Sequence, residues 1–207
     1  MGAPVDQMRT YVKKDVVYFR TTTGEFGPLS NMAPDFPIVL LDIRIPTTEA
    51  LYQACRYPNL PDVQRLIIDQ VSPMTAKMKS KKYRSQTRDD WDSVRVNIMR
   101  WCLRIKLSQH WLRFGAVLRK TQDKPIVEES AKDEFWGAKP REDGTLVGSN
   151  ILGRLLMELR QQHRDVEFGK LQELRYPSIP NFLFLGEPIN NISRRTDMHC
   201  EVQDSMF

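Results

Sequence analysis

Four polar side chains recur at helical spacing in the segment TTEALYQACRY, residues 47–57. They are Glu49, Tyr52, Gln53 and Arg56, at positions i, i+3, i+4 and i+7 of one predicted helix face. A carboxylate on such a face can stabilise a positive charge or transfer a proton, and a guanidinium can bind a phosphate. An amphipathic surface helix shows the same pattern, so the stripe predicts a site only in combination with other features.

A second concentration of reactive side chains is the segment EESAKDEFWG, residues 128–137, in which four carboxylates precede an aromatic pair and a glycine. Glu128 and Glu129 end the strand-like run KPIVEE, where alternation turns one of the two side chains outward. Glu134 is also expected to be exposed. The fourth carboxylate of the segment is Asp133.

Cysteine and histidine do not form a metal-binding pattern in this sequence. The residues are few and widely spaced: Cys55, Cys102, Cys200, His110, His163 and His199. His199 and Cys200 are adjacent, but a zinc site needs further ligands beside them. The sequence predicts neither a disulfide framework nor a metal or other cofactor.

The chain is basic, with a net charge of +5 and an isoelectric point near 9.1. Basic residues gather in KMKSKKYR, residues 77–84, a run that suits phosphate or nucleic acid but also a solvated helix end. The sequence has no apolar run of membrane-spanning length, and the N-terminus lacks the apolar block of a signal peptide. We expect a cytoplasmic protein with no membrane partner.

Local patterns predict the elements that would hold these residues. The 207 residues and 24.2 kDa suit one domain. Strands are expected in VVYFR (16–20) and FPIVLLDIRI (36–45), and a short one in KPIVEE. Helices are expected at 46–56, 61–71, from 72, 91–109, 108–121 and 151–164, with 91–109 as the central core helix. The fold class is α+β: a mainly helical single domain, residues 1–165, with a small N-terminal sheet. Residues 166–207 are expected to be a C-terminal extension packed on the domain, with a frayed end.

Six short segments occur in an order that is typical of one protein family. They are EFGPLSNM, TEALYQACRY, PMTAKMKSKK, DDW, SAKDEFWG and GSNILGRLLMELR. Together they cover roughly residues 15 to 162 and resemble the NADAR family, also called YbiA-like. The Ser-Asn turn departs from the family pattern, because Met32 stands where a Phe usually follows.

The resemblance implies a YbiA-like fold and an enzyme that hydrolyses an N-glycosidic bond to a phosphorylated ribose. Similar members remove ADP-ribose from guanine in DNA or RNA and so reverse modification by DarT-type toxins, which implies ADP-ribose, ADP-ribosylated guanine and such a toxin as partners. Other members act on early riboflavin-pathway intermediates. A non-catalytic ADP-ribose reader is a further alternative, against which Glu49, Lys77 and Asp133 argue.

The family pattern also implies site residues in this chain. Glu49, Lys77 and Asp133 are the catalytic candidates, the two carboxylates for charge stabilisation and proton transfer. Trp91 and Trp136 would form ring walls, whereas Trp101 and Trp111 fit the core. The full set of predicted binding residues is Ser30, Asn31, Tyr52, Gln53, Arg56, Trp91, Trp136, Gly137, Asn150 and Gly153.

Gly137 and Gly153 would let the backbone approach a diphosphate, and Asn150 would cap its helix and face the ligand. Lys77 has two alternative roles. If burial freed its amine, Lys77 could attack ribose C1, expel guanine and hold the opened sugar as a Schiff base. Otherwise the lysine is a phosphate clamp and water attacks directly.

Overall fold

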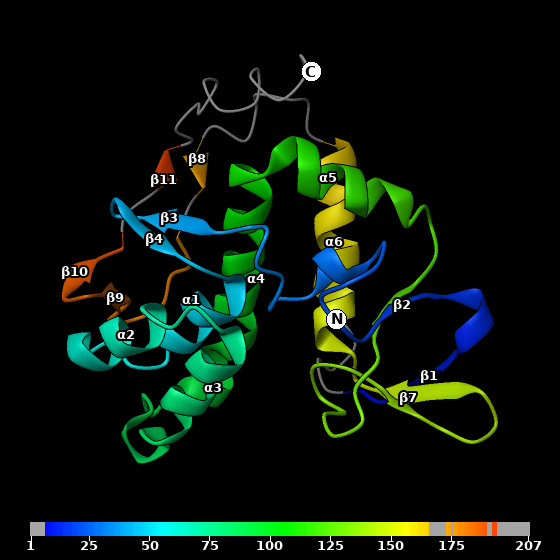
Figure 1. Cartoon of the computed structure of the whole chain (residues 1–207), viewed down its shortest axis with the longest axis horizontal. Coiled ribbons are helices and arrows are strands. Elements are labelled where there is room, and N and C mark those ends of the chain that lie inside the picture. The colour runs from blue at the N-terminus through cyan, green and yellow to red at the C-terminus, as the bar shows by residue number, and fades with distance from the viewer. Residues whose placement is uncertain (1–6, 166–172, 175, 190–191, 194–207) are drawn as a thin grey trace.

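The helix α4 (Trp91–Gln109) lies at the centre of the molecule in the computed structural model, which describes residues 7–165, 173–174, 176–189 and 192–193 (Figure 1). Its apolar positions are buried as the sequence spacing predicts: Val94, Ile98, Trp101, Cys102 and Ile105. The predicted role of α4 as the core helix is therefore confirmed.

The other helices begin near their predicted starts, and side-chain caps fix the first turns of α1 and α3. They are α1 (Thr48–Ala54), α2 (Pro61–Ile68), α3 (Pro73–Lys81), α5 (Trp111–Lys120) and α6 (Ile151–Asp165). The Thr47 side chain accepts a hydrogen bond from Ala50 N at 3.2 Å, and the Ser72 side chain accepts one from Thr75 N at 3.4 Å. Proline occupies the first turn of α2 and α3, where its missing N–H has no cost.

Strands are short and form several small sheets. β1 (Arg9–Val12), β7 (Thr145–Gly148) and β6 (Lys139–Pro140) make an antiparallel sheet, while β2 (Val17–Phe19) runs parallel to β5 (Ile126–Glu128). Hairpins join β3 (Ile38–Leu40) to β4 (Ile43–Ile45) and β9 (Leu183–Phe184) to β10 (Glu187–Pro188), and β8 (Glu173–Leu174) pairs with β11 (Ile192–Ser193). The predicted α+β class is confirmed, and β1 and β2 pair with strands from after residue 125.

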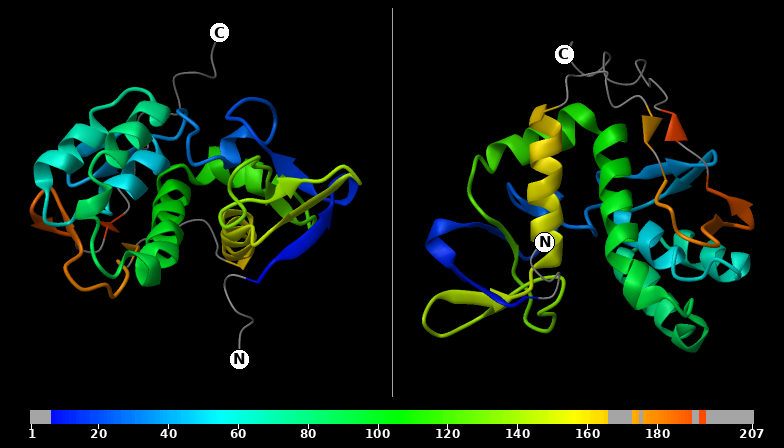
Figure 2. Two further views of the ribbon diagram at one scale, coloured as in Figure 1. Left: turned by 90° about the horizontal axis from the view of Figure 1, so that it is seen from below. Right: turned by 180° about the vertical axis from the view of Figure 1, so that it is seen from behind.

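The two sides of α4 carry different elements. Helices α1, α2 and α3 gather on one side, and α6 with β1, β2 and β7 lies on the other, in both Figure 1 and Figure 2. α4 packs against α1 and against α6. Segments from the first, middle and last thirds of the domain therefore meet beside this helix.

Residues 176–189, from the predicted extension, pack on the side of α4 that carries α1, α2 and α3, which we call the helical side (Figure 1 and Figure 2). Phe184 is fully buried, and Phe182 meets the Trp101 ring edge-on with centroids 5.0 Å apart. The buried Gln64 side chain donates to Ala54 O and Leu183 O, both at 3.1 Å. The predicted frayed end and the His199-Cys200 pair lie outside the described residues. No helix in the part of the chain that the structure describes is long and apolar enough to cross a membrane.

Candidate functional site

A cavity of about 280 Å³ lies between the helical side and the loop after β5. Its walls come from residues of α1, α3 and α4, from the turn after residue 29, from the end of β5 and from the loop that follows. The lining residues are Ser30, Asn31, Met32, Glu49, Tyr52, Gln53, Arg56, Lys77, Arg84, Arg95, Met99, Glu128, Ser130, Asp133, Phe135, Trp136 and Leu152. The helical stripe and the segment EESAKDEFWG thus meet at one cavity although about 80 residues separate them.

Most of the predicted site residues line this cavity. They are Ser30, Asn31, Glu49, Tyr52, Gln53, Arg56, Lys77, Asp133 and Trp136. Four others do not line it: Trp91, Gly137, Asn150 and Gly153. A larger groove lined by residues 16–21, 23–27, 120–122 and 124 contains none of the predicted residues.

Glu49 is held from both its backbone and its side chain. Its backbone N–H donates to Asn31 O at 2.9 Å, which joins the first turn of α1 to the Ser-Asn turn. Gln53 Nε2 donates to Glu49 Oε1 at 2.9 Å, and Ser80 Oγ donates to Gln53 Oε1 at 2.9 Å. This chain of bonds fixes the orientation of both the amide and the carboxylate, so Glu49 is a preorganised acceptor at the cavity wall.

Three buried polar atoms of lining residues have no hydrogen-bond partner among the described residues: Asn31 Oδ1, Arg56 Nε and Arg95 Nε. Buried polar atoms in folded proteins are nearly always paired. Burial lowers the pKa of Arg56 from its usual value. The guanidinium nevertheless stays charged, because arginine is not deprotonated in proteins at neutral pH. Asn31 and Arg56 therefore offer an acceptor and a charged donor to a ligand.

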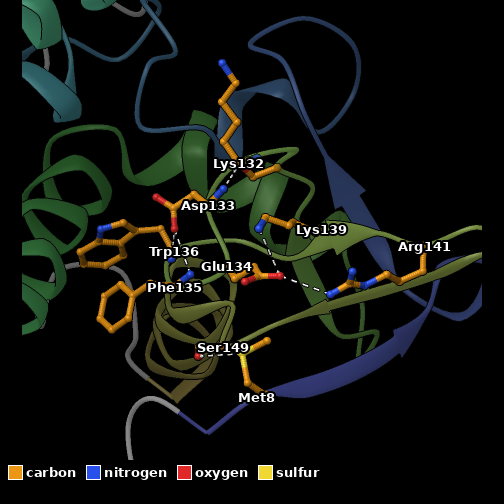
Figure 3. A network of polar contacts seen from close by, with 10 residues as sticks. Met8, Lys132, Asp133, Glu134, Phe135, Trp136, Lys139, Arg141 and Ser149 are labelled. Carbon is orange, nitrogen blue, oxygen red and sulfur yellow. Dashed lines mark hydrogen bonds and ion pairs between the residues drawn. The ribbon is translucent and has the colours of Figure 1, made fainter.

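Asp133 organises the loop between β5 and β6 (Figure 3). One oxygen, Oδ1, accepts hydrogen bonds from Phe135 N at 2.9 Å and Trp136 N at 2.8 Å. Lys132 is exposed and points away from the Trp136 ring in Figure 3. Glu134, about a third exposed, is paired with Lys139 at 3.3 Å and with Arg141, outside the cavity lining.

The aromatic wall consists of the Tyr52 and Trp136 rings, which meet edge-on with centroids 5.5 Å apart. Trp91 lies behind this wall. It is buried, its ring is 5.1 Å from that of Tyr52, and the Arg56 guanidinium stacks on it at 4.3 Å. Trp91 therefore supports two lining residues from behind. Burial, with the neighbouring Glu49 charge, raises the pKa of Tyr52 well above its usual value, so this phenol remains protonated.

Glu128 is a carboxylate of the cavity lining that the sequence analysis did not assign to the site. It is partly buried and faces the cavity with Glu49 and Asp133, whereas the adjacent Glu129 pairs with Lys13 at 2.7 Å outside the lining. Burial, reinforced by the charges of Glu49 and Asp133 and opposed by that of Lys77, raises the pKa of Glu128 to about 7. The alternation of side chains was predicted, but not which of the two glutamates faces inward.

Asn150, Gly137 and Gly153 act on the protein backbone. The fully buried Asn150 side chain donates to Ile126 O at 2.8 Å and accepts from Glu128 N at 3.1 Å. A Cβ at Gly137 would lie 2.6 Å from Glu128 O, and one at Gly153 would overlap Ile126 O. All three residues thus allow β5 to sit close to its neighbours, which differs from the predicted contact with a ligand.

Two lysines differ in their environment. Lys77 is exposed where it lines the cavity, whereas the covalent hypothesis required a buried amine. Lys106 is fully buried on α4, and its Nζ donates to Pro28 O at 2.6 Å and to Ser30 O at 3.1 Å. Burial lowers the pKa of Lys106 to about 7. Sequence reasoning missed this lysine because it occupies a helix position where charge is normally solvated.

The described residues contain no group of three or more His, Cys, Asp or Glu side chains arranged to hold a metal ion. The cavity lining contains three carboxylates, several cations and an aromatic wall.

Comparison with known proteins places the chain in a family. The NADAR domain model matches residues 17–164. The N-glycosidase YbiA of Escherichia coli is 32% identical over 163 residues, covering 78% of this chain and 97% of that protein. The riboflavin biosynthesis protein VVA0006 of Vibrio vulnificus is 30% identical over 155 residues, covering 75% of this chain and 40% of that protein. The NMR structure of E. coli YbiA superimposes with a TM-score of 0.62 at 28% identity, covering 81% of this chain and 99% of that one. The predicted family and its fold are thereby confirmed: the chain belongs to the NADAR domain family.

Proposed function

We propose that the protein is a hydrolase of N-glycosidic bonds that removes ADP-ribose from guanine in nucleic acid, reversing DarT-type modification. The coarser part, N-glycosidic hydrolysis, is supported by the relatives named N-glycosidase, among them YbiA of E. coli and Npun_R5314 of Nostoc punctiforme. The identity of the substrate is supported by the side chains that line the cavity.

The observation that carries the proposal is the combination of side chains at one cavity. Breaking the bond between ribose C1 and a base nitrogen builds positive charge on the sugar, which a nearby carboxylate such as Glu49 stabilises. Arg56, Arg84 and Arg95 line the same space and suit a diphosphate. The Trp136 ring offers a flat face to a base. The cavity volume lies near the lower end for ligand sites, so we expect the ribose and its neighbouring groups to be enclosed.

The test is release of ADP-ribose from a defined substrate. The protein is incubated with an oligonucleotide that carries one ADP-ribosylated guanine, and free ADP-ribose and restored guanine are followed by mass spectrometry. We expect both products in equal amounts. Binding of ADP-ribose without any release would instead make the protein a reader.

A second candidate substrate is an early intermediate of riboflavin synthesis. Its support is that two relatives, VVA0006 and PYRR of Zea mays, are named riboflavin biosynthesis proteins. The same assay run in competition distinguishes the two substrates. A higher kcat/KM for the small phosphorylated intermediate than for the modified oligonucleotide would favour this alternative.

A further inference from the structure

We propose that Glu128 is the proton donor of the cavity and protonates the departing base as the N-glycosidic bond breaks. This assignment rests on the proposed N-glycosidase function and adds a catalytic residue to it. It also separates the roles of the three carboxylates that line one cavity.

The backbone of Glu128 is held rigidly by its neighbours. β5 pairs in parallel with β2, where Phe19 lies opposite Glu128. Glu128 N donates to Asn150 Oδ1 at 3.1 Å, and Glu128 O accepts from Ala138 N at 2.8 Å. A proton donor needs a fixed distance to the atom that it protonates, and a strand bonded on both sides supplies it.

The charges around Glu128 favour its protonated form. Glu49, Asp133 and Glu128 face one small space, and like charges at such a site disfavour simultaneous ionisation. Burial and the two neighbouring carboxylates raise the pKa of Glu128 to about 7, although Lys77 opposes the shift. The remaining charged groups facing the cavity are the guanidiniums of Arg56 on α1, Arg84 after α3 and Arg95 on α4.

The other two carboxylates of the cavity already accept hydrogen bonds from the protein. Glu49 Oε1 accepts from Gln53 Nε2, and Asp133 Oδ1 accepts from two backbone N–H groups. An ionised carboxylate accepts hydrogen bonds only, whereas a protonated one can also donate. Glu49 is therefore suited to stabilising positive charge on the sugar, and Asp133 holds the loop through its backbone N–H groups. Glu128 is the carboxylate that remains for proton transfer.

The chemistry balances with water as the single co-reactant. The electron pair of the C1–N bond passes to the base nitrogen, and the Glu128 carboxyl proton neutralises the departing base. Water adds to C1 and loses a proton, which returns to the Glu128 carboxylate. Glu49 faces the positive charge on the sugar while that bond is broken.

The decisive measurement is the pH dependence of kcat/KM for Glu128→Gln, with Glu129→Gln as the matched control because Glu129 is adjacent, buried and outside the cavity lining. We expect wild-type kcat/KM to fall about tenfold per pH unit above ~7, since the free enzyme must hold the proton. Glu128→Gln should lose on the order of a hundredfold at pH 6 and lack this limb. Glu129→Gln should keep the wild-type profile. The same alkaline limb in Glu128→Gln would overturn the assignment.

A second readout needs no substrate. In protein labelled with 13C at glutamate carboxyl carbons, one resonance should titrate near pH 7 in wild type and in Glu129→Gln, and be missing in Glu128→Gln. If wild type releases no ADP-ribose, the proposed function fails. If wild type releases ADP-ribose but no glutamate titrates near neutral pH, the function stands and the Glu128 assignment fails.

Discussion

Glu49 and Glu128 show how one cavity gives two carboxylates different tasks. Glu49 is anchored by Gln53 and lines the same cavity as Glu128, and we expect its charge to be the feature that stabilises the transition state. We predict that Glu49→Gln lowers kcat on the order of a hundredfold or more while ADP-ribose still binds, because the amide keeps the shape and removes the charge. Single-turnover release and calorimetric binding of ADP-ribose measure the two effects. Glu158→Gln, a change at a residue paired with Arg100 on α4, is the control. Near-normal turnover in Glu49→Gln would refute the role.

Lys77 distinguishes a covalent from a direct-water mechanism. Because its side chain is exposed at the cavity, the structure favours the phosphate clamp over a buried nucleophile. We predict that Lys77→Ala weakens ADP-ribose binding more than it lowers kcat, and that borohydride added during turnover traps no adduct. Peptide mass spectrometry checks the second point. An ADP-ribose adduct reduced onto Lys77 would establish the Schiff-base route instead.

At the scale of elements, β5 depends on a single side chain of the α6 region. Asn150 adopts φ 48°, a left-handed conformation that asparagine tolerates better than most residues, and its amide bonds both Ile126 and Glu128. Asn150→Ala should lower the free energy of unfolding by about 2 kcal/mol, since two buried backbone groups lose their partners. We also expect kcat to fall more than KM rises, because Glu128 loses its mounting. Asn97→Ala, at an exposed position of α4, is the control. Loss of stability with unchanged kcat would limit Asn150 to a structural role.

The helices were predictable because their signals are local. Thr47, Ser72 and the prolines of α2 and α3 mark starts, and the spacing of apolar residues in α4 matches one buried face. The stripe on α1 was predictable for the same reason. Strand pairing was not, since β2 meets β5 across more than a hundred residues and three-residue strands carry no register signal.

The same limit explains what was missed in the site. Ile126 and Val127 are both buried, so β5 shows no alternation that would reveal which glutamate faces the cavity. The roles of Asn150 and Gly153 also follow from contacts with β5 that no local pattern shows. Lining residues carried by one helix or one loop were thus predictable, whereas the contacts made where two distant segments meet were not.

At the scale of the whole molecule, several exposed lysines of α3 and its C-terminal end lie at or after the residue that lines the cavity. The net charge is +5, and the exposed basic residues of α3 and its C-terminal end include Lys77, which lines the cavity, as well as Lys81 and Lys82, which follow it along the helix. A substrate embedded in nucleic acid would extend its phosphates beyond the cavity and meet this surface, whereas a free nucleoside would not. Binding of the two kinds of substrate should therefore respond differently to salt.

We predict that KM for an ADP-ribosylated oligonucleotide rises with salt much more steeply than KM for ADP-ribosylated guanosine, because each phosphate contact releases counterions. For a single strand, each contact contributes a slope of about 0.7 in a plot of log affinity against log salt. The double variant Lys81→Gln/Lys82→Gln should lower the oligonucleotide slope by about 1.4 units and leave the nucleoside unaffected. The matched control is Lys120→Gln/Lys124→Gln, which removes the same charge from exposed lysines that line the other groove. Equal effects of the two double variants would show that only net charge matters. Equal salt slopes for oligonucleotide and nucleoside in the wild type would place the flanking strand away from α3 and favour a small-molecule substrate.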